Sequence, residues 1–386
     1  MIKLKKLFLF IFVFITLISN VYAEDKTDLI KNARSGVLMD SSSGKILFEK
    51  DKDERVAPAS MTKMVAQILI LENIENGNLS WDEKVRASKN AAGMGGSQIW
   101  LQEGEEMSVR DLMKGITMAS ANDATVALAE RIGGTEEKFV QMMNDKIKEL
   151  GLKNTNFVNP TGLDEDNHYS SAYDMAMIAK ELLNHEQILE FSSVYEDYIR
   201  VGTPNKFWVV NTNKLVRFYQ GADGLKTGFT DNAKYCMAVT AKRDNMRLIA
   251  VVLGEDSGKV RNAETMEMLD YGFNLYKVDL IKSKNDVVTN LKINKADKES
   301  INIYPKKDIT ILGKKSDASL KYDIEFEKGK IELPLKKGDV VGNIIIKNGN
   351  NVVGKVDAVV NENIKTIGFF KLLLNNFKDI VSGNLI

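Results

Sequence analysis

The sequence contains a single cysteine, Cys236, among 386 residues. An intrachain disulfide is therefore excluded, and the fold must be stabilised by packing. Cys236 lies in an apolar run, 233–239, that is typical of a β-strand. We expect its thiol to be buried as a small hydrophobic side chain.

Histidine is almost as scarce, with only His168 and His185 in the chain. Neither accompanies a Gly-x-Ser-x-Gly motif, and a hydrolase of the Ser-His-Asp type would have to use one of the two as its base. No set of histidine, cysteine and aspartate residues has the spacing of a metal site. The glycine-rich segment 92–97 lacks the ending of a phosphate-binding loop, so we expect a mobile loop and no cofactor.

The chain has no excess of charge, with 53 basic and 53 acidic residues. The first 23 residues hold three lysines and no acids, so their removal leaves a formal charge of −3. Nothing in this balance favours nucleic acid as a partner.

Residues 1–23 have the pattern of a secretory signal peptide. Lysines precede an apolar run from Leu7 to Ile18, and Val21-Tyr22-Ala23 comes before Glu24. The apolar run is short for a membrane span. We predict export with cleavage after Ala23; the alternative is an uncleaved N-terminal anchor.

Residues 24–278 are predicted to form an α+β domain with one antiparallel sheet and a helical insert. The expected strands are 36–40, 45–49, 225–229, 234–240 and 247–253. Helices are expected to begin at Ser108, Thr135, Ser171 and Val260.

Residues 279–363 change to short alternating runs, which predict a small all-β domain without a reactive site. The runs are 301–304, 308–312, 322–326, 331–333, 343–346 and 352–360.

The tail, residues 364–386, is predicted to form an amphipathic helix. One helical face carries Phe370, Leu373, Leu374, Phe377 and Val381. We expect an in-plane membrane anchor, whereas the alternative is a helix packed on the β-rich domain.

Ser60 and Lys63 stand directly before the apolar run 64–71. If that run is a helix, the two side chains share one face of its first turn, so a hydroxyl and an amine are neighbours. Ser60 would also lie near the positive end of the helix dipole. The alternative is an ordinary helix cap, because Ser-x-x-Lys is a frequent chance match.

A serine without histidine needs another base, and lysine can serve when burial and a second cation lower its pKa. Two further motifs could provide such surroundings. Ser120-Ala121-Asn122 lies between two expected helices, the second of which it should cap, and Lys226-Thr227-Gly228 lies in an expected strand, where the glycine lets a ligand approach the backbone. Taken singly, they are typical of a helix cap and a strand end.

Together and in this order, segments 57–63, 120–124 and 223–230 resemble the signature set of the low-molecular-mass penicillin-binding proteins, specifically the serine D-alanyl-D-alanine carboxypeptidases. Segment 159–163 also resembles this family. The resemblance covers nearly the whole chain. It implies a penicilloyl-serine transferase/β-lactamase-like domain, β-lactams as covalent inhibitors, and a place on the outer face of the bacterial cytoplasmic membrane.

The resemblance also implies a role for each matching residue. Ser60 would attack the carbonyl between the two terminal D-alanines of a peptidoglycan stem pentapeptide, and Lys63 would take its proton. Ser120 would pass a proton to the leaving amine. The residues expected to bind substrate are Asn122, Lys226, Thr227, Gly228, Phe229 and Arg261.

Among these, Asn122 would bind the substrate amide and help orient Lys63, Thr227 would bind the terminal carboxylate, and Lys226 would supply positive potential. The backbone N–H groups of Ser60 and Phe229 would form the oxyanion hole. Some members carry histidine where this chain has Phe229, which bears on pH dependence and specificity.

Arg261, at the start of the last predicted helix, is a candidate for a second carboxylate contact, because a guanidinium matches a carboxylate. Its alternative is an exposed surface arginine.

Two other functions are compatible with parts of the pattern. A β-lactamase of this fold would need a deacylating Glu-x-x-x-Asn between the second and third motifs, and the corresponding stretch 154–162 has no acid. A non-catalytic envelope protein that binds peptidoglycan is disfavoured, because every reactive position is present.

Overall fold

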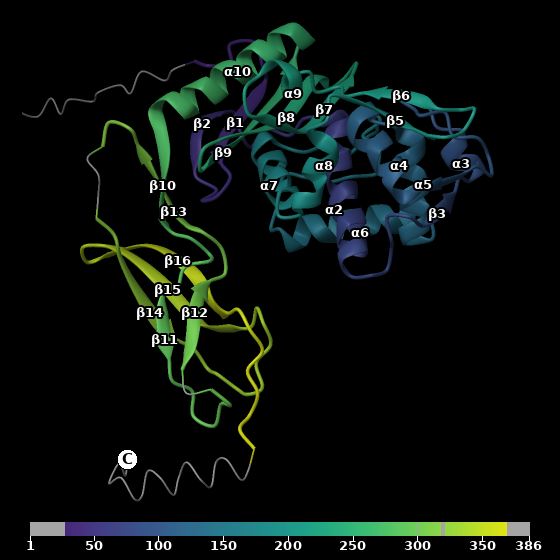
Figure 1. Cartoon of the computed structure of the whole chain (residues 1–386). Helices are drawn as coiled ribbons and strands as arrows, with labels where there is room; N and C mark the ends of the chain where they lie inside the picture. The colour runs from purple at the N-terminus through teal and green to yellow at the C-terminus, as the bar shows by residue number, and fades with distance from the viewer. Residues whose placement is uncertain (1–27, 299, 318–320, 369–386) are drawn as a thin grey trace, which may run out of the picture.

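The larger domain is built on a five-stranded antiparallel sheet with the order β2-β1-β9-β8-β7 (Figure 1). This computed structural model describes residues 28–298, 300–317 and 321–368. The strands are β1 (Ser35–Asp40), β2 (Ile46–Lys50), β7 (Ala222–Thr230), β8 (Lys234–Arg243) and β9 (Met246–Glu255). The N-terminal hairpin thus joins strands from much later in the chain, as β1 pairs along its length with β9.

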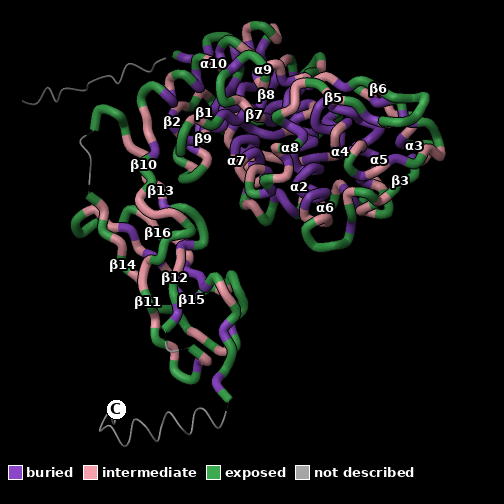
Figure 2. The backbone as a smooth tube through the Cα atoms, viewed as in Figure 1, coloured by how far each residue is buried: buried purple, intermediate pink, exposed green. Residues whose placement is uncertain are grey.

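Both faces of this sheet are buried. Helix α10 (Gly258–Leu275) packs on one face of β9, and α7 (Ala172–Leu182) packs on the other. Alternate residues of β9 belong to two separate hydrophobic cores, with Ile249 and Val251 in one and Leu248 and Ala250 in the other. The sheet therefore forms the buried centre of the domain (Figure 2).

The insert between β2 and β7 forms a helical lobe. Its central helix α2 (Lys63–Glu75) is buried on all sides from residue 63 to residue 71, which is the burial expected of an apolar helix without a polar face. Besides α7, the other α-helices of the insert are α3 (Lys89–Ala92), α4 (Val109–Lys114), α5 (Asn122–Gly133), α6 (Glu136–Glu149), α8 (Leu189–Ser192) and α9 (Leu215–Phe218). Two small two-stranded antiparallel sheets complete it, β3 (Lys84–Arg86) with β4 (Glu106–Ser108) and β5 (Glu196–Ile199) with β6 (Phe207–Val210).

Three predicted helix starts are confirmed by their caps. The side chains of Ser108, Thr135 and Ser171 each accept a hydrogen bond from the backbone N–H three residues later. Each therefore satisfies a donor that the first helical turn leaves unpaired.

The second domain is a five-stranded antiparallel sheet with the order β11-β12-β16-β15-β14, accompanied by the pair β10–β13. Its strands are β10 (Tyr276–Lys282), β11 (Thr289–Leu291), β12 (Ile301–Pro305), β13 (Ile309–Lys314), β14 (Asp323–Lys328), β15 (Val340–Asn348) and β16 (Asn351–Val360). Strand β10 follows α10 directly and runs across the predicted boundary at 278/279. The strand expected at 331–333 is wrong: the segment is irregular and is followed by Pro334, which cannot donate to a ladder.

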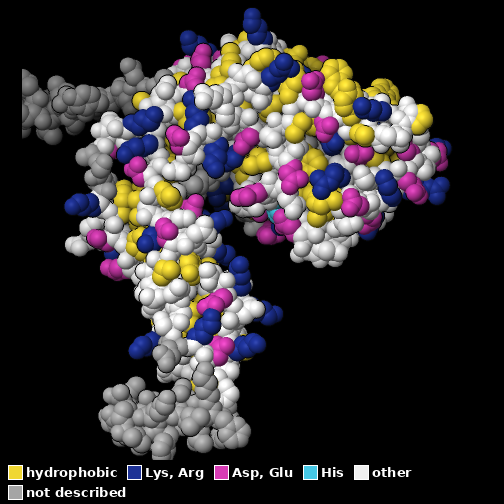
Figure 3. All heavy atoms as spheres, in the orientation of Figure 1, with side chains coloured by type: hydrophobic (Ala, Val, Ile, Leu, Met, Phe, Trp, Pro, Cys, Tyr) yellow, Lys and Arg dark blue, Asp and Glu magenta, His cyan; other side chains and the backbone are white. Residues whose placement is uncertain are grey.

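The tail begins within the fold of the second domain. Ile364 pairs with Leu335 and Thr366 with Ala296 in isolated bridges, so these first tail residues extend the β-rich domain. The predicted amphipathic face at 370–381 and the predicted signal peptide lie outside the described residues. Among the helices that the structure describes, none is both long and apolar enough to cross a bilayer. Charges of both signs are interspersed over the face shown in Figure 3.

Candidate active site

Ser60 lies in a short 3-10 turn, η1 (Ala59–Thr62), that leads directly into α2. The preceding Ala59 has a φ of 48°, in the left-handed region that non-glycine residues rarely adopt. Lys63, the first residue of α2, is fully buried, whereas Ser60 is half-buried. Its Nζ lies 2.9 Å from Ser60 Oγ. The structure thus brings together the hydroxyl and the amine that the sequence predicts to be neighbours.

Two glycines let other segments approach the backbone of the nucleophile turn. A Cβ on Gly162 would lie 1.8 Å from Ala59 O, and a Cβ on Gly228 would lie 3.2 Å from Ser60 N. Gly162 also has a φ of 83°, which favours glycine independently of space. Strand β7 therefore passes directly beside Ser60.

Thr161 contributes a contact that the sequence did not assign. Its carbonyl oxygen accepts a hydrogen bond from Lys63 Nζ over 2.6 Å. A turn presents this carbonyl: Asn159 Oδ1 accepts from the backbone N–H groups of Thr161 and Gly162. The Asn-Pro-x-Gly pattern is a turn signal that could have located it.

Ser120 and Lys226 form a second serine–lysine pair, with 2.9 Å between Oγ and Nζ. Ser120 follows the π-helical turn η2 (Gly115–Ala119), a local irregularity that often occurs at functional sites, and has a φ of 61°. The segment begins α5, but the expected side-chain cap is wrong: the N-cap residue is Ala121 and no side chain caps the helix. The hydroxyl instead accepts from Lys226, which also donates to Thr227 O.

Asn122 connects the site to the glycine-rich segment. Its Nδ2 donates to Gly95 O over 2.7 Å, and its backbone N–H donates to Ser97 O. Its Oδ1 is buried without a hydrogen-bond partner among the described residues. The expected contact that orients Lys63 is therefore made by Thr161 instead, and the Asn122 oxygen is left unpaired.

The two lysines have altered pKa values. Burial lowers the pKa of Lys63 well below its ordinary value, and the charge of Lys226 lowers it further. Burial likewise lowers the pKa of Lys226 to about 7, with Arg261 as the second cause. Arg261 thus acts on Lys226 and Lys226 acts on Lys63, and burial together with the neighbouring charge shifts the Lys63 amine toward its neutral form.

Arg261 is buried, so its alternative as an exposed surface arginine is wrong. It lies in the first turn of α10, and its guanidinium donates to Cys236 O and to Asn262 Oδ1. Cys236 is fully buried, as predicted, and burial raises the pKa of its thiol to about 11. The thiol is therefore an inert part of the packing behind β7.

The rim of the site is formed partly by the end of β7. Thr227 Oγ1 donates to Thr212 Oγ1 over 2.8 Å. The Phe229 side chain is 50% exposed, and its ring centroid lies 4.5 Å from that of Tyr235. Phe229 thus presents an apolar surface to solvent next to Gly228.

His168 does not supply a base to Ser60. Its Nδ1 accepts from the backbone N–H of Val158, and its Nε2 lies 2.8 Å from Thr62 Oγ1. Burial lowers the pKa of the ring to about 4, so the imidazole is neutral. Its two nitrogens thus connect the nucleophile turn at Thr62 to the backbone of Val158.

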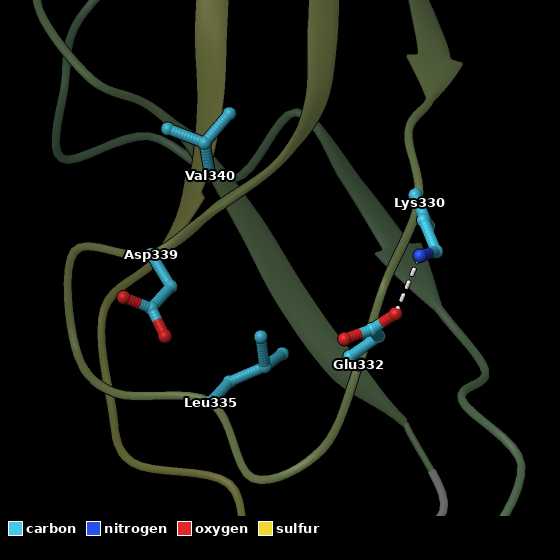
Figure 4. A pocket seen from close by; sticks show the side chains of 5 residues that line it. All are labelled: Lys330, Glu332, Leu335, Asp339 and Val340. Carbon is cyan, nitrogen blue, oxygen red and sulfur yellow. Dashed lines mark ion pairs between the residues drawn. The ribbon is translucent and has the colours of Figure 1, made fainter.

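A hollow in the β-rich domain has none of these features. Its volume is about 390 Å³, and its walls include an ion pair between Lys330 and Glu332 (Figure 4). The other lining residues are Leu335, Asp339 and Val340. It lacks a nucleophile beside a base, so the candidate active site is the one around Ser60.

Comparison with known families agrees with this site. A family model described as D-alanyl-D-alanine carboxypeptidase matches residues 22–257, more than half of the chain. The chain belongs to the D-alanyl-D-alanine carboxypeptidase family. A second model, described as the C-terminal domain of penicillin-binding protein 5, matches residues 276–366. The predicted family is therefore confirmed, and so is the predicted fold class of the two domains, whereas the predicted C-terminal helix lies outside the described residues.

Curated relatives and solved structures match between 62% and 92% of this chain. D-alanyl-D-alanine carboxypeptidase DacF of Bacillus subtilis is 46% identical over 92% of this chain and 91% of its own. The structure of penicillin-binding protein 5 from Haemophilus influenzae has a TM-score of 0.68 at 31% identity, covering 86% of this chain and 98% of its own. Penicillin-binding protein D2 from Listeria monocytogenes, in its ampicillin-bound form, has a TM-score of 0.57 at 33% identity, covering 62% and 97%.

Proposed function

We propose that this chain removes the terminal D-alanine from peptidoglycan stem pentapeptides through an acyl-enzyme on Ser60, and that penicillin acylates the same oxygen. The observation that carries the proposal is the 2.9 Å contact between Ser60 Oγ and the buried Lys63 Nζ, whose pKa is lowered. A part-buried hydroxyl beside an amine whose lowered pKa favours the neutral form can be activated as a nucleophile.

In acylation, Ser60 Oγ attacks the carbonyl carbon between the two terminal D-alanines, and its proton passes to Lys63 Nζ. The hydrogen bond from Lys63 Nζ to Thr161 O directs the amine, which supports this role because a base must be held in place. The C–N bond then breaks, and D-alanine leaves with a proton delivered through Ser120. The product is an ester between Ser60 and the shortened peptide.

Substrate recognition is assigned to the second half of the site. Lys226, with its hydrogen bond to Ser120, would attract the terminal carboxylate, which Thr227 Oγ1 would bind together with the guanidinium of Arg261. Asn122 would hold the substrate amide, since its Oδ1 is buried and unpaired and a peptide N–H could satisfy it.

The oxyanion hole is assigned to the backbone N–H groups of Ser60 and Phe229. The close approach of β7 to the nucleophile turn at Gly228 supports this assignment, because a side chain there would separate the two segments. Each such donor typically contributes about 3 kcal/mol to stabilising the tetrahedral intermediate.

Water then hydrolyses the ester and regenerates Ser60. In a β-lactamase of this fold a glutamate would activate that water for rapid penicillin hydrolysis. The stretch 154–162 holds no acid, and its Thr161 and Gly162 are used in supporting the nucleophile turn. We therefore expect the ester formed with penicillin to be hydrolysed slowly, whereas the ester formed with the peptide substrate is hydrolysed in each catalytic cycle.

Location at the cell envelope follows from the substrate. We further propose that residues 1–23 are a signal peptide and that the tail from residue 367 onward attaches the mature enzyme to the outer face of the cytoplasmic membrane. Deletion of residues 367–386 should release the enzyme into the soluble fraction while D-alanine release continues. Unchanged membrane association would overturn the anchor.

The decisive experiment combines two measurements on the mature chain. Incubation with diacetyl-Lys-D-Ala-D-Ala should release D-alanine, and mass spectrometry after treatment with penicillin should find the adduct on the peptide that contains Ser60. Rapid penicillin turnover without D-alanine release would indicate a β-lactamase. Absence of both activities and of the adduct would indicate a non-catalytic peptidoglycan-binding protein.

A further inference from the structure

A second cluster of ionisable side chains lies at the opposite end of α2 from Lys63. Glu72, Glu181 and His185 place one potential ligand atom each within 4.8 Å of the others. Glu72 follows Lys63 by nine residues, which is roughly 14 Å along the helix axis. The cluster is therefore separate from the active site, and the long interval in sequence between Glu72 and Glu181 explains why no metal spacing is visible there.

His185 is the member that points to a ligand. It precedes η3 (Glu186–Ile188), and its side chain is 9% exposed. Its Nδ1 lies 2.9 Å from Glu75 Oε1, while its Nε2 is buried without a hydrogen-bond partner in the part of the chain that the structure describes. A carboxylate that accepts from Nδ1–H leaves the lone pair on Nε2, as in histidines that bind metals.

We propose that Glu72, Glu181 and His185 bind a divalent transition-metal ion of the Zn²⁺ type, with Glu75 as a positioning residue for His185. One imidazole nitrogen and two carboxylate oxygens are donors that zinc accepts, and water would complete a tetrahedral set. The ion would join the C-terminal end of α2 to the end of α7 and to η3. Its role would be structural, since the site contains no nucleophile.

Lys146 sets the strength of this site. Its Nζ lies 2.7 Å from Glu72 Oε1 and 2.7 Å from Glu149 Oε2. The ammonium occupies one oxygen of Glu72 and repels a cation, whereas the second oxygen of Glu72 remains available. Asn184 Nδ2 also holds Glu181 by donating to Oε2 over 2.8 Å. The bound ion therefore competes with Lys146, so removal of the lysine charge should tighten metal binding.

The test is calorimetric titration of the metal-stripped mature enzyme with ZnCl₂, together with visible absorption after addition of Co²⁺. We expect one ion per chain and a tetrahedral Co²⁺ spectrum. His185→Gln and Glu181→Gln should lose both signals, and Glu75→Gln should weaken zinc affinity about 10- to 100-fold. Glu149→Gln is the matched control, because it removes an acid bonded to Lys146 but outside the cluster; its metal affinity should not fall.

Lys146→Met gives an independent arm, since the proposal requires it to bind zinc more tightly than the wild type. Penicillin labelling of every variant should match the wild type and so show that each is folded. Zinc binding that survives unchanged in His185→Gln, or no zinc binding by either the wild type or Lys146→Met, would overturn the proposal. In the latter case the cluster serves only as an ion-pair network for Lys146.

Discussion

The active site contains two serine–lysine pairs that have the same distance between hydroxyl and amine but different surroundings. Ser60 and Lys63 lie 2.9 Å apart, as do Ser120 and Lys226. Ser60 is half-buried and open to a substrate, whereas Ser120 is only 4% exposed. A matching distance therefore does not imply a matching function, because only the first hydroxyl is open to attack a peptide.

The two lysines also differ in the groups that lower their pKa values. Burial and the charge of Lys226 lower the pKa of Lys63 well below its ordinary value, whereas burial and the charge of Arg261 lower the pKa of Lys226 to about 7. The lowered pKa of Lys63 favours it as a proton acceptor, and a pKa of about 7 lets part of Lys226 still present a cation to a carboxylate near neutral pH.

Exchange of each serine should break this comparison most strongly. Ser60→Ala should abolish both covalent penicillin labelling and D-alanine release, because the acyl ester forms on the Ser60 oxygen. Ser120→Ala should keep the adduct but slow its formation by about 10²- to 10⁴-fold, the usual contribution of proton transfer. Labelling is measured by mass spectrometry and stopped-flow fluorescence. Equal loss in both variants would contradict the division of functions.

Matched arginine substitutions should separate the two lysines. Lys63→Arg should lose acylation by about 10²-fold or more, because a guanidinium stays charged and cannot accept the serine proton. Lys226→Arg should keep substrate binding, because the cation is retained. The measurement is kcat/KM for the D-Ala-D-Ala peptide, and thermal unfolding is the control for folding. Lys63→Met is a second variant at this position, which removes the amine without adding a charge.

The pH dependence of kcat/KM tests the charge of Lys226. Lys226 loses its charge as pH rises through about 7, so kcat/KM for a carboxylate substrate should fall on the alkaline side. Lys226→Arg should remove that fall, whatever its effect on the maximum, since the pKa of arginine is far higher. An alkaline limb that stays in place would show that another group controls it.

Much of the catalytic half could be predicted from the sequence. The helix starts at Ser108, Thr135 and Ser171 follow from local capping chemistry, which needs only a few consecutive residues. The neighbourhood of Ser60 and Lys63 follows from helical periodicity. The fold class required the order of strands and helices together with the resemblance carried by the three motifs.

The rest depends on contacts between distant segments. Thr161 reaches Lys63 through a loop about a hundred residues later, and its contribution is a backbone carbonyl that any residue type could offer. The sequence predicts that the segment beginning at Ser120 caps a helix. The prediction fails because Ser120 has a left-handed conformation after a π-helical turn, and no sequence pattern marks that conformation. The burial of Arg261 likewise depends on the packing of α10 on the sheet.

The backbone around the first pair is packed closely against Gly162, and substitution of this glycine tests that packing. Gly162→Ala should destabilise the fold by about 1–3 kcal/mol through its left-handed φ alone. The added Cβ would also lie 1.8 Å from Ala59 O, so Ser60 must shift and acylation should slow. Gly151→Ala is the control: its φ of 71° gives similar strain, but a Cβ there meets nothing within 4 Å. Chemical denaturation and penicillin labelling measure the two effects, and equal behaviour of the variants would exclude the clash.

Arg261→Gln should have the smallest effect and decides how the guanidinium acts. Removal of its charge raises the pKa of Lys226, so Lys226 stays protonated to higher pH and the alkaline limb of kcat/KM should move upward, by less than about one unit. If Arg261 also binds the substrate carboxylate, KM should rise at every pH, including below pH 6, where Lys226 is charged in both proteins. A shifted limb with an unchanged KM at low pH would restrict Arg261 to setting the charge of the second pair, and would remove it from the residues that bind substrate.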